Sequence, residues 1–312
     1  MSVGAGMLAD LGAELEARLP GRVRRDVSSA ELTTYRCGGP LAVFVRAECE
    51  DDLNVVAEVL RPARVPVLVV GRGSNLLVSD AGFRGVAIAL TGELEQLDID
   101  RASARVRAGG AVALPVLARR TASVGVGGLE FFVGIPGSVG GAVRMNAGGH
   151  GADTAAVIVT ARVIDLDGGG PRELSRAELG LGYRQSALTA RAVVLGAVFS
   201  GRNDEPAACA ERVDEIVRWR REHQPGGQNA GSVFTNPPGD AAGRLIEAAG
   251  CKGLRLGGAV VSEKHANFFV ADPGAAAADV YALIELVQRR VEESCGVHLE
   301  PELRCIGFGE RR

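Results

Sequence analysis

Two glycine-rich stretches and one serine-containing turn carry the residue types from which chemistry can be built. The first stretch, VPVLVVGRGSNLLVSD, is an apolar run followed directly by Gly71, Arg72, Gly73, Ser74 and Asn75. Glycines that follow a strand let successive backbone N–H groups point in one direction, which forms a concave site for a phosphate or pyrophosphate. The third glycine of GxGxxG and the GK[ST] of a Walker loop are both missing, so a plain tight turn stays an alternative.

The second stretch, GIPGSVGGAVRMNAGG, covers residues 134–149. Apolar residues precede its glycines and interleave with them, among them Phe131, Phe132, Val139 and Met145. A mobile surface linker needs no such residues. Backbone groups without side chains in front of them suit a flat polar ring, so the stretch predicts a site for a planar heterocyclic cofactor. Close packing of two elements through small residues stays an alternative.

The third feature is the turn QNAGSVFTNPPG, in which Ser232 follows Gly231. A serine fixed in such a turn is placed to give or take a proton. A GxSxG elbow is missing around it, which argues against a hydrolase. A capping or backbone-bonding role for the hydroxyl stays open.

These features must be positioned by the elements between them. Apolar periodicity predicts helices over residues 7–18, 50–63, 114–125, 206–224, 240–249 and 275–295, and strands over 41–47, 65–71, 85–90, 104–109, 155–166, 191–200 and 265–271. We expect Pro62 to end the second helix. The order of strand, helix and strand over residues 41–71 predicts a βαβ unit with parallel pairing, and the mixture after residue 92 predicts an α+β domain.

Composition narrows the class of protein. The 312 residues suffice for two or three domains, and 46% of them are hydrophobic, as in globular proteins. A net charge of −3 without a block of Lys and Arg argues against a nucleic-acid partner. The six cysteines have no zinc-type spacing, which predicts free thiols and no metal site. With no signal-peptide pattern and no apolar run near the ~20 residues of a membrane span, we expect a cytoplasmic protein without a membrane partner.

Seven segments, in chain order, carry a family resemblance. They are TTYRCGGP (33–40), GRGSNLLVSD (71–80), GLEFFVGIPGSVGGAVRMNAGG (128–149), LGYRQSAL (181–188), GSVFTNP (231–237), SEKHANFFV (262–270) and LEPELRCIG (299–307). Together they resemble the UDP-N-acetylenolpyruvoylglucosamine reductase family, flavoenzymes of peptidoglycan precursor synthesis. The resemblance implies an α+β chain with a vanillyl-alcohol-oxidase-type (PCMH-type) FAD-binding fold in two subdomains, 1–91 and 92–223. An α/β substrate-binding domain, 224–312, would follow, with its C-terminal segment returning to the active site.

The resemblance also implies cofactors and the residues that bind them. NADPH would reduce a bound FAD, which would reduce the small-molecule substrate, UDP-N-acetylglucosamine enolpyruvate. The FAD pyrophosphate would be cradled by Gly71, Arg72, Gly73, Ser74 and Asn75, and the flavin ring lined by Gly134, Ile135, Pro136, Gly137, Ser138, Gly140, Gly141 and Asn146. Because the pyrophosphate loop holds no His or Cys, we expect the FAD to be non-covalent and released on denaturation.

The family's three catalytic roles map onto Arg184, Ser232 and Glu302, with Glu300 as a rival carboxylate. Reduction of an enolpyruvyl double bond takes a hydride on the methylene carbon, delivered from the flavin, and a proton on the carbon that bears the ether oxygen and carboxylate. Arg184 would meet the charge that builds on the carboxylate. A buried Glu302 would donate a hydrogen bond to the same oxygens, and Ser232 would supply the proton.

The sequence departs from the family pattern at Thr235, where many members have lysine, which leaves a phosphate contact at this position open. It also resembles the branch that lacks a tyrosine-bearing loop over the substrate, so the site is expected to close differently. We expect a structural role for His265 and a monomer or weak dimer. Two other functions stay open, an oxygen-using flavin oxidase of the same fold and a non-catalytic nucleotide-sugar-binding protein.

Overall fold

The computed structural model describes residues 4–309 of the chain. These residues form two units. The first holds residues 4–26, 42–72 and 84–219, and the second holds residues 27–41, 73–83 and 220–309. Each unit is therefore assembled from segments that are distant in the sequence.

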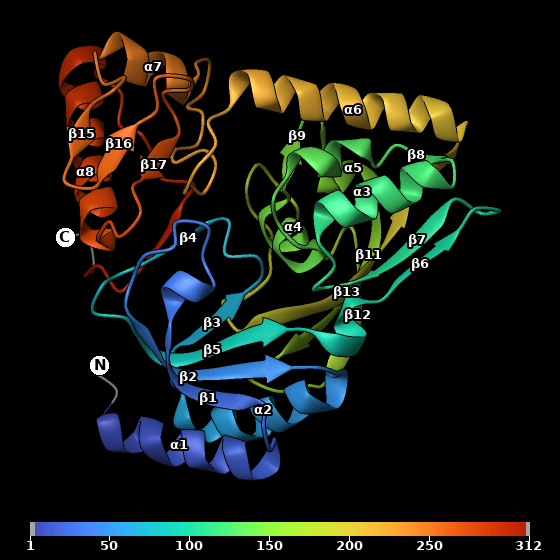
Figure 1. The fold of residues 1–312 in the computed structure, drawn as a ribbon. Helices are drawn as coiled ribbons and strands as arrows, with labels where there is room; N and C mark the ends of the chain where they lie inside the picture. Colours follow the sequence, from blue (N-terminus) through green and yellow to red (C-terminus); the bar gives the residue numbers. More distant parts are fainter. Residues whose placement is uncertain (1–3, 310–312) are drawn as a thin grey trace. The chain divides into compact units, whose positions relative to one another are not determined.

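One sheet, almost entirely within the first unit, carries the N-terminal strands. Its order is β1 (Val23–Ser28), β2 (Pro40–Ala47), β5 (Phe83–Leu90) and β3 (Val67–Val70), and α1 (Ala5–Arg18) and α2 (Glu50–Ala63) lie together on one side of it (Figure 1). β3 and β5 pair in parallel. Because β5 lies between β2 and β3, the two strands of the predicted βαβ unit are not neighbours, and their predicted pairing is wrong. The crossover through α2 skips one strand position.

The bounds of α2 follow from its end residues. Acidic side chains fill its first turn, where the helix dipole favours negative charge. The Asp52 carboxylate accepts hydrogen bonds from the N–H groups of Glu48 (2.7 Å) and Cys49 (3.3 Å). At the other end the helix stops at Ala63, one residue beyond Pro62, close to the predicted position.

A second sheet of the first unit is antiparallel throughout. Its order is β12 (Pro171–Ser175), β11 (Ile158–Asp165), β13 (Ala192–Ser200), β7 (Arg105–Gly109) and β6 (Leu97–Asp100). Around it lie η2 (Gly92–Glu95), α3 (Leu114–Ser123), η3 (Glu130–Gly134), α4 (Val139–Met145), α5 (Thr154–Val157) and α6 (Pro206–His223), with the short pairs β8 (Val126–Gly127) with β14 (Arg202–Asn203) and β9 (Gly148–Gly149) with β10 (Ala152–Asp153). The predicted helices near 114–125 and 206–224 and the strands near 104–109, 155–166 and 191–200 are confirmed.

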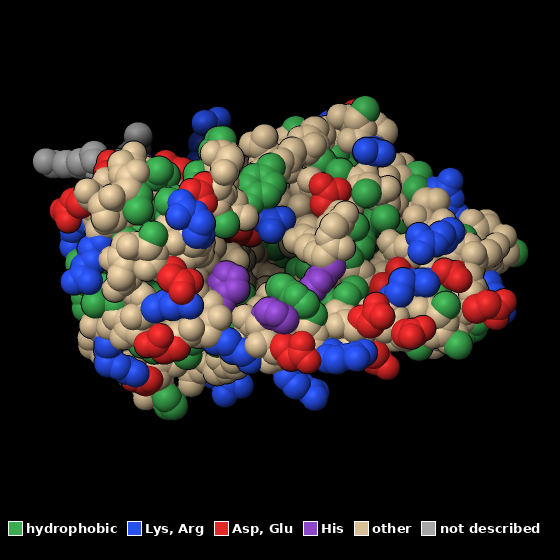
Figure 2. Space-filling view, turned by 90° about the horizontal axis from the view of Figure 1, so that it is seen from above, with side chains coloured by type: hydrophobic (Ala, Val, Ile, Leu, Met, Phe, Trp, Pro, Cys, Tyr) green, Lys and Arg blue, Asp and Glu red, His purple; other side chains and the backbone are tan. Residues whose placement is uncertain are grey.

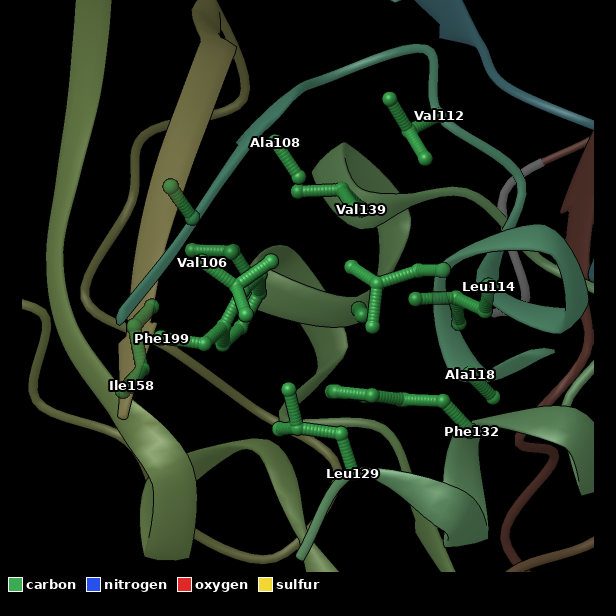
Figure 3. Packing of buried hydrophobic residues seen from close by; sticks show 14 of the residues in the cluster. Val106, Ala108, Val112, Leu114, Ala118, Leu129, Phe132, Val139, Ile158 and Phe199 are labelled. Carbon is green, nitrogen blue, oxygen red and sulfur yellow. The ribbon is translucent and has the colours of Figure 1, made fainter. Parts of the chain in front are cut away.

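The core of this part of the first unit lies between the second sheet and the helices. Val106 and Phe199 from the sheet and Leu114 from α3 meet in one apolar cluster (Figure 3). The rings of Phe132 and Phe199 lie edge to face, with centroids 5.5 Å apart, an arrangement that aromatic quadrupoles favour. Phe132 comes from η3, so this packing fixes the segment that leads into the glycine-rich stretch.

The glycine-rich stretch contains a helix that the sequence did not predict. α4 buries Val139, Ala142 and Val143 and includes Gly140. A Cβ at Gly140 would lie 3.2 Å from the carbonyl oxygen of Gly110, so this glycine does permit the close packing that was left as an alternative. Glycine lowers helix propensity by roughly 1 kcal/mol per residue, which is why tertiary packing rather than local preference forms this helix.

The second unit gathers the C-terminal elements around α8 (Ala277–Cys295). It contains η1 (Ser29–Glu31), α7 (Ala242–Ala248), the antiparallel sheet of β15 (Arg255–Leu256), β16 (Ala259–Val261) and β17 (Phe269–Ala271), and the parallel pair of β4 (Leu76–Val78) with β18 (Arg304–Ile306). α8 buries one apolar face, including Val280, Leu283 and Ile284. The predicted strand at 265–271 is shorter than expected, because residues 265–268 form a turn closed by the N–H of Phe268 on the carbonyl of His265 (2.9 Å).

Surface and thiol features agree with the composition. On the face shown in Figure 2, Lys and Arg side chains alternate with Asp and Glu, without a large patch of one sign. All six cysteines are free, as predicted. Among residues 4–309, every helix is too short or too polar to cross a lipid bilayer.

Candidate active site

The residues predicted to line a flavin ring lie in the first unit, around the start of α4. Gly134 ends η3 and Ser138 precedes the first residue of α4. A Cβ at Gly71, directly after β3, would lie only 2.6 Å from Oγ of Ser138, whose residue is 2% exposed. The fold thus joins the first two glycine-rich stretches at a point where a side chain at residue 71 would have to displace the Ser138 hydroxyl.

The loop predicted to hold a pyrophosphate begins in the first unit with Gly71 and Arg72. Gly73 has a φ of +63°, and a Cβ there would collide with the carbonyl of Leu32, so this position requires glycine. Asn75 donates from Nδ2 to the carbonyl oxygen of Glu302 (3.1 Å). Part of this loop therefore supports the segment that carries the predicted catalytic carboxylate.

Ser232 and Glu302 lie on adjacent segments of the second unit. Phe234 pairs with Pro301 in an isolated bridge, and the carbonyl of Val233 accepts hydrogen bonds from the N–H groups of Glu302 (2.8 Å) and Leu303 (3.2 Å). Within residues 4–309, the Ser232 hydroxyl has no hydrogen-bond partner, and Ser232 lines a cavity. The hydroxyl is therefore available to a bound molecule.

The rival carboxylate, Glu300, is far more exposed. Its side chain is 74% exposed and lies 3.9 Å from His298, whereas Glu302 is half-buried. A half-buried side chain is better placed to contact a bound substrate than one that points into solvent, so these environments favour Glu302. Thr235 binds the same segment, with its N–H (2.9 Å) and Oγ1 (3.2 Å) both directed to the carbonyl of Glu300.

Arg184 lies in the first unit, in a tight turn beside the glycine-rich stretch. Gly182 and Gln185 exchange two backbone hydrogen bonds (3.1 and 3.3 Å) across the turn, and Arg184 has a φ of +56°. Its Nη2 donates to the carbonyl of Gly148 (3.3 Å), and its guanidinium carbon lies 5.2 Å from the ring centroid of Tyr183. The structure thus brings the predicted catalytic arginine to the predicted flavin segment.

A cavity of about 410 Å³ in the second unit extends from Ser232. Its charged lining comes from Arg244, Lys252 and Lys264, with His265 beside them, and from Glu247, whose carboxylate accepts a hydrogen bond from Lys252 (2.8 Å). Burial lowers the pKa of His265, which favours the neutral ring. Sequence reasoning missed Lys252, which stands outside the seven segments and carries no local signal.

The glycine positions test whether a flavin cofactor fits. A Cβ at Gly149 would meet nothing within 4 Å, and one at Gly141 would meet only Oγ of Ser138, at 3.8 Å. Packing within the protein therefore does not demand glycine at these two positions. Bare backbone with open space in front of it fits a planar ring, so the residues present suit the cofactor.

A cluster of Glu130, Asp204 and Cys209 has ligand atoms close enough to hold a metal ion. Arg212 already occupies this place, donating to Oε1 of Glu130 (2.8 Å) and Oδ2 of Asp204 (2.5 Å). The guanidinium supplies the positive charge that a metal ion would bring. The cluster is an ion-pair network of the first unit.

Comparisons with known proteins identify the family. A model described as "UDP-N-acetylenolpyruvoylglucosamine reductase, C-terminal domain" matches residues 223–306, and a model for an FAD-binding domain matches residues 40–170. The UDP-N-acetylenolpyruvoylglucosamine reductase of Paramagnetospirillum magneticum is 45% identical over 295 residues, which cover 93% of this chain and 94% of that protein. This chain belongs to the UDP-N-acetylenolpyruvoylglucosamine reductase family.

Other relatives agree with this assignment. A reductase of the same name from Methylorubrum extorquens is 44% identical over 93% of each chain. The crystal structure of UDP-N-acetylenolpyruvylglucosamine reductase (MurB) from Thermus caldophilus has a TM-score of 0.80 and 36% identity, and covers 91% of this chain and 99% of that one.

The family assignment confirms the predicted fold and cofactors. The chain has the FAD-binding fold of the PCMH type, and its family uses FAD and NADPH. The matches support the reductase and give no support to an oxygen-using oxidase or a non-catalytic binding protein. The individual site residues stay predictions.

Proposed function

We propose that this chain catalyses the NADPH-dependent reduction of UDP-N-acetylglucosamine enolpyruvate to UDP-N-acetylmuramate through FAD, in peptidoglycan precursor synthesis. Membership of the reductase family over 93% of the chain carries the proposal. The pairing that holds Ser232 beside the Glu302 segment supports it. The reaction takes place in the cytoplasm, and the enzyme is a monomer or weak dimer.

We assign the chain to two FAD-binding subdomains, 1–91 and 92–223, and a substrate-binding domain, 224–312. Three hydrophobic clusters support this division. One is built mainly from residues 8–94, a second from residues 104–213, and a third mainly from residues 230–303. Pairing of β18 with β4 brings the C-terminal segment back to the strand that follows the pyrophosphate loop.

When bound, FAD reduced by NADPH would supply the hydride. The backbone of Gly71 to Asn75 would hold its pyrophosphate, and Gly134 to Gly141 would line the ring. Asn146 would join this lining through Oδ1. That oxygen accepts a hydrogen bond from the N–H of Ala155, and its second lone pair could accept one from the flavin.

Three side chains would act on the substrate. Arg184 is always protonated and meets the substrate carboxylate as negative charge builds on it. Glu302 donates a hydrogen bond to the same oxygens from its protonated form. Ser232 gives its proton to the carbon that bears the ether oxygen, and water replenishes the hydroxyl.

The cavity beside Ser232 would hold the nucleotide-sugar. Lys252 and Lys264 line it and offer positive charge to the diphosphate, since charge-assisted hydrogen bonds to phosphate are strong. This arrangement places the cationic groups in the second unit without a lysine at position 235.

The test is an anaerobic stopped-flow experiment on the purified yellow protein. NADPH should bleach the flavin band, and UDP-N-acetylglucosamine enolpyruvate should then restore it. A flavin that recovers only with oxygen would instead establish an oxidase, and a colourless protein that binds the sugar nucleotide would establish a binding protein.

A further inference from the structure

The side chain of Asn146 joins the end of α4 to the turn that carries Arg184. Asn146 follows the last residue of α4, is 4% exposed and has a φ of +41°. Its Nδ2 donates to the carbonyl of Gly182 (3.0 Å) and to Oδ2 of Asp153 (3.1 Å), and its Oδ1 accepts from the N–H of Ala155 (2.8 Å). Both amide hydrogens are therefore used inside the first unit.

The turn that Asn146 holds is a strained one. Arg184 adopts a left-handed conformation, with a φ of +56°, which is unfavourable for a residue that carries a Cβ. Such conformations persist only where the surroundings over-determine them. The carbonyl of Gly182 closes the turn by accepting the N–H of Gln185, and it also accepts Nδ2 of Asn146. Asn146 thus fixes the atom on which the turn depends.

The guanidinium of Arg184 is tied to the same region. Its Nη2 donates to the carbonyl of Gly148, two residues beyond Asn146. Backbone and head group of Arg184 therefore both take their position from residues 146–148. A contact to the backbone of the turn alone would leave the long side chain of Arg184 free to rotate about its χ angles, and the hydrogen bond to Gly148 restricts that rotation.

A left-handed helix end alone does not account for Asn146. Glycine meets that requirement more often than asparagine does, and neither needs a hydrogen bond to a turn 36 residues away. The amide has two donors for Gly182 and Asp153 and one acceptor for Ala155, whereas an aspartate would lack the donors and would face the carboxylate of Asp153.

We propose that Asn146 is a positioning residue for Arg184, holding the 182–185 turn so that the guanidinium is presented to the substrate carboxylate. The inference rests on the proposed catalytic role of Arg184. It assigns to Asn146 a part in the step that uses the enolpyruvyl substrate, beyond the proposed contact with the cofactor.

The first test is a readout that does not depend on catalysis. In Asn146→Gly, which keeps the left-handed conformation, amide hydrogen exchange at Gln185 should become faster, because its acceptor loses its second anchor. Arg144→Gln is the matched control. Arg144 links α4 to the carbonyls of Thr189 and Ala192 (both 2.7 Å), so its replacement should leave exchange at Gln185 unchanged. Unchanged exchange in Asn146→Gly would overturn the proposal.

The second test is a double-mutant cycle on the two half-reactions. Asn146→Gly should slow flavin reoxidation by the enolpyruvyl sugar by roughly 10- to 100-fold, the loss expected of a misplaced catalytic group. The rate is measured per bound FAD, because Asn146 is also proposed to line the cofactor site. In an Arg184→Ala background the same substitution should have no further effect, because residues that act as a unit are not additive. Asn146→Asp should behave like Asn146→Gly.

The outcomes separate the two proposals. Equal losses in both backgrounds would show that Asn146 does not act through Arg184. If the reduced flavin of the wild-type enzyme is not reoxidised by the enolpyruvyl sugar, the proposed function is refuted. Hydrogen exchange at Gln185 would still decide whether Asn146 holds the turn.

Discussion

Replacement of Ser232 by alanine tests the proposed proton donor, because the structure separates its chemistry from its structural role. The backbone of this segment is held independently of the hydroxyl, by the N–H of Val233 on the carbonyl of Asn267 (2.9 Å) and by the pairing of Ser232 with Phe268. Within residues 4–309 the hydroxyl has no partner to lose. We expect the free energy of unfolding to change by less than about 0.5 kcal/mol.

The expected effect on the reaction is much larger. A positioned proton donor contributes ~10²-fold or more, equivalent to about 2.7 kcal/mol of activation free energy. Under anaerobic conditions, with flavin absorbance followed near about 450 nm, Ser232→Ala should bleach with NADPH at the wild-type rate. Recovery on addition of the enolpyruvyl sugar should be slower by that factor.

The matched control is Ser294→Ala on α8, whose hydroxyl donates to the carbonyl of Arg290 (2.6 Å). It should show wild-type bleaching and recovery. Wild-type recovery in Ser232→Ala would refute the reasoning, since another group would then supply the proton. Equal slowing of bleaching and recovery would refute it as well, because Ser232 would then act on cofactor binding.

Gly71→Ala should lower both the thermal stability and the flavin bound per chain after gel filtration, because the added Cβ would lie 2.6 Å from Oγ of Ser138. Gly149→Ala should keep the thermal stability of the wild type, because its Cβ would have nothing within 4 Å. Equal thermal stability of the Gly71 variant and wild type would contradict this steric reasoning. Burial raises the pKa of Glu130, but hydrogen bonds from backbone N–H groups and Arg212 outweigh it and hold the pKa below its usual value. Its contribution to stability is therefore present above the ordinary carboxyl pKa of about 4.3 and is lost as the pH falls through the folded-state value. Glu130→Gln should lower the free energy of unfolding by about 2 kcal/mol at neutral pH, less than the loss of a partner from a fully buried pair, because the Arg212 side chain is 34% exposed. In urea unfolding, this difference between the variant and the wild type should vanish in acid. Acid denaturation of the yellow protein should release all FAD into the supernatant, and flavin retained on the chain would show a covalent bond.

The sequence determined the local features of this protein. Gly73, with its φ of +63°, could be recognised as a special backbone position because only glycine adopts such angles freely. Periodicity located α3, α6 and β13 correctly, since the burial pattern of a helix or strand repeats within a few residues. The order of the seven segments was enough to indicate the family.

Tertiary structure decided what local patterns could not. β5 lies between β2 and β3 although it follows both in the chain, and α4 forms within a glycine-rich stretch that disfavours helix. The contact of Asn75 with Glu302 spans 227 residues, and the amide of Asn146 finds its partner in the turn of Arg184. Side-chain types and backbone sterics act over a few neighbours, whereas these contacts depend on which apolar faces pack together, and that is settled only when the whole chain folds.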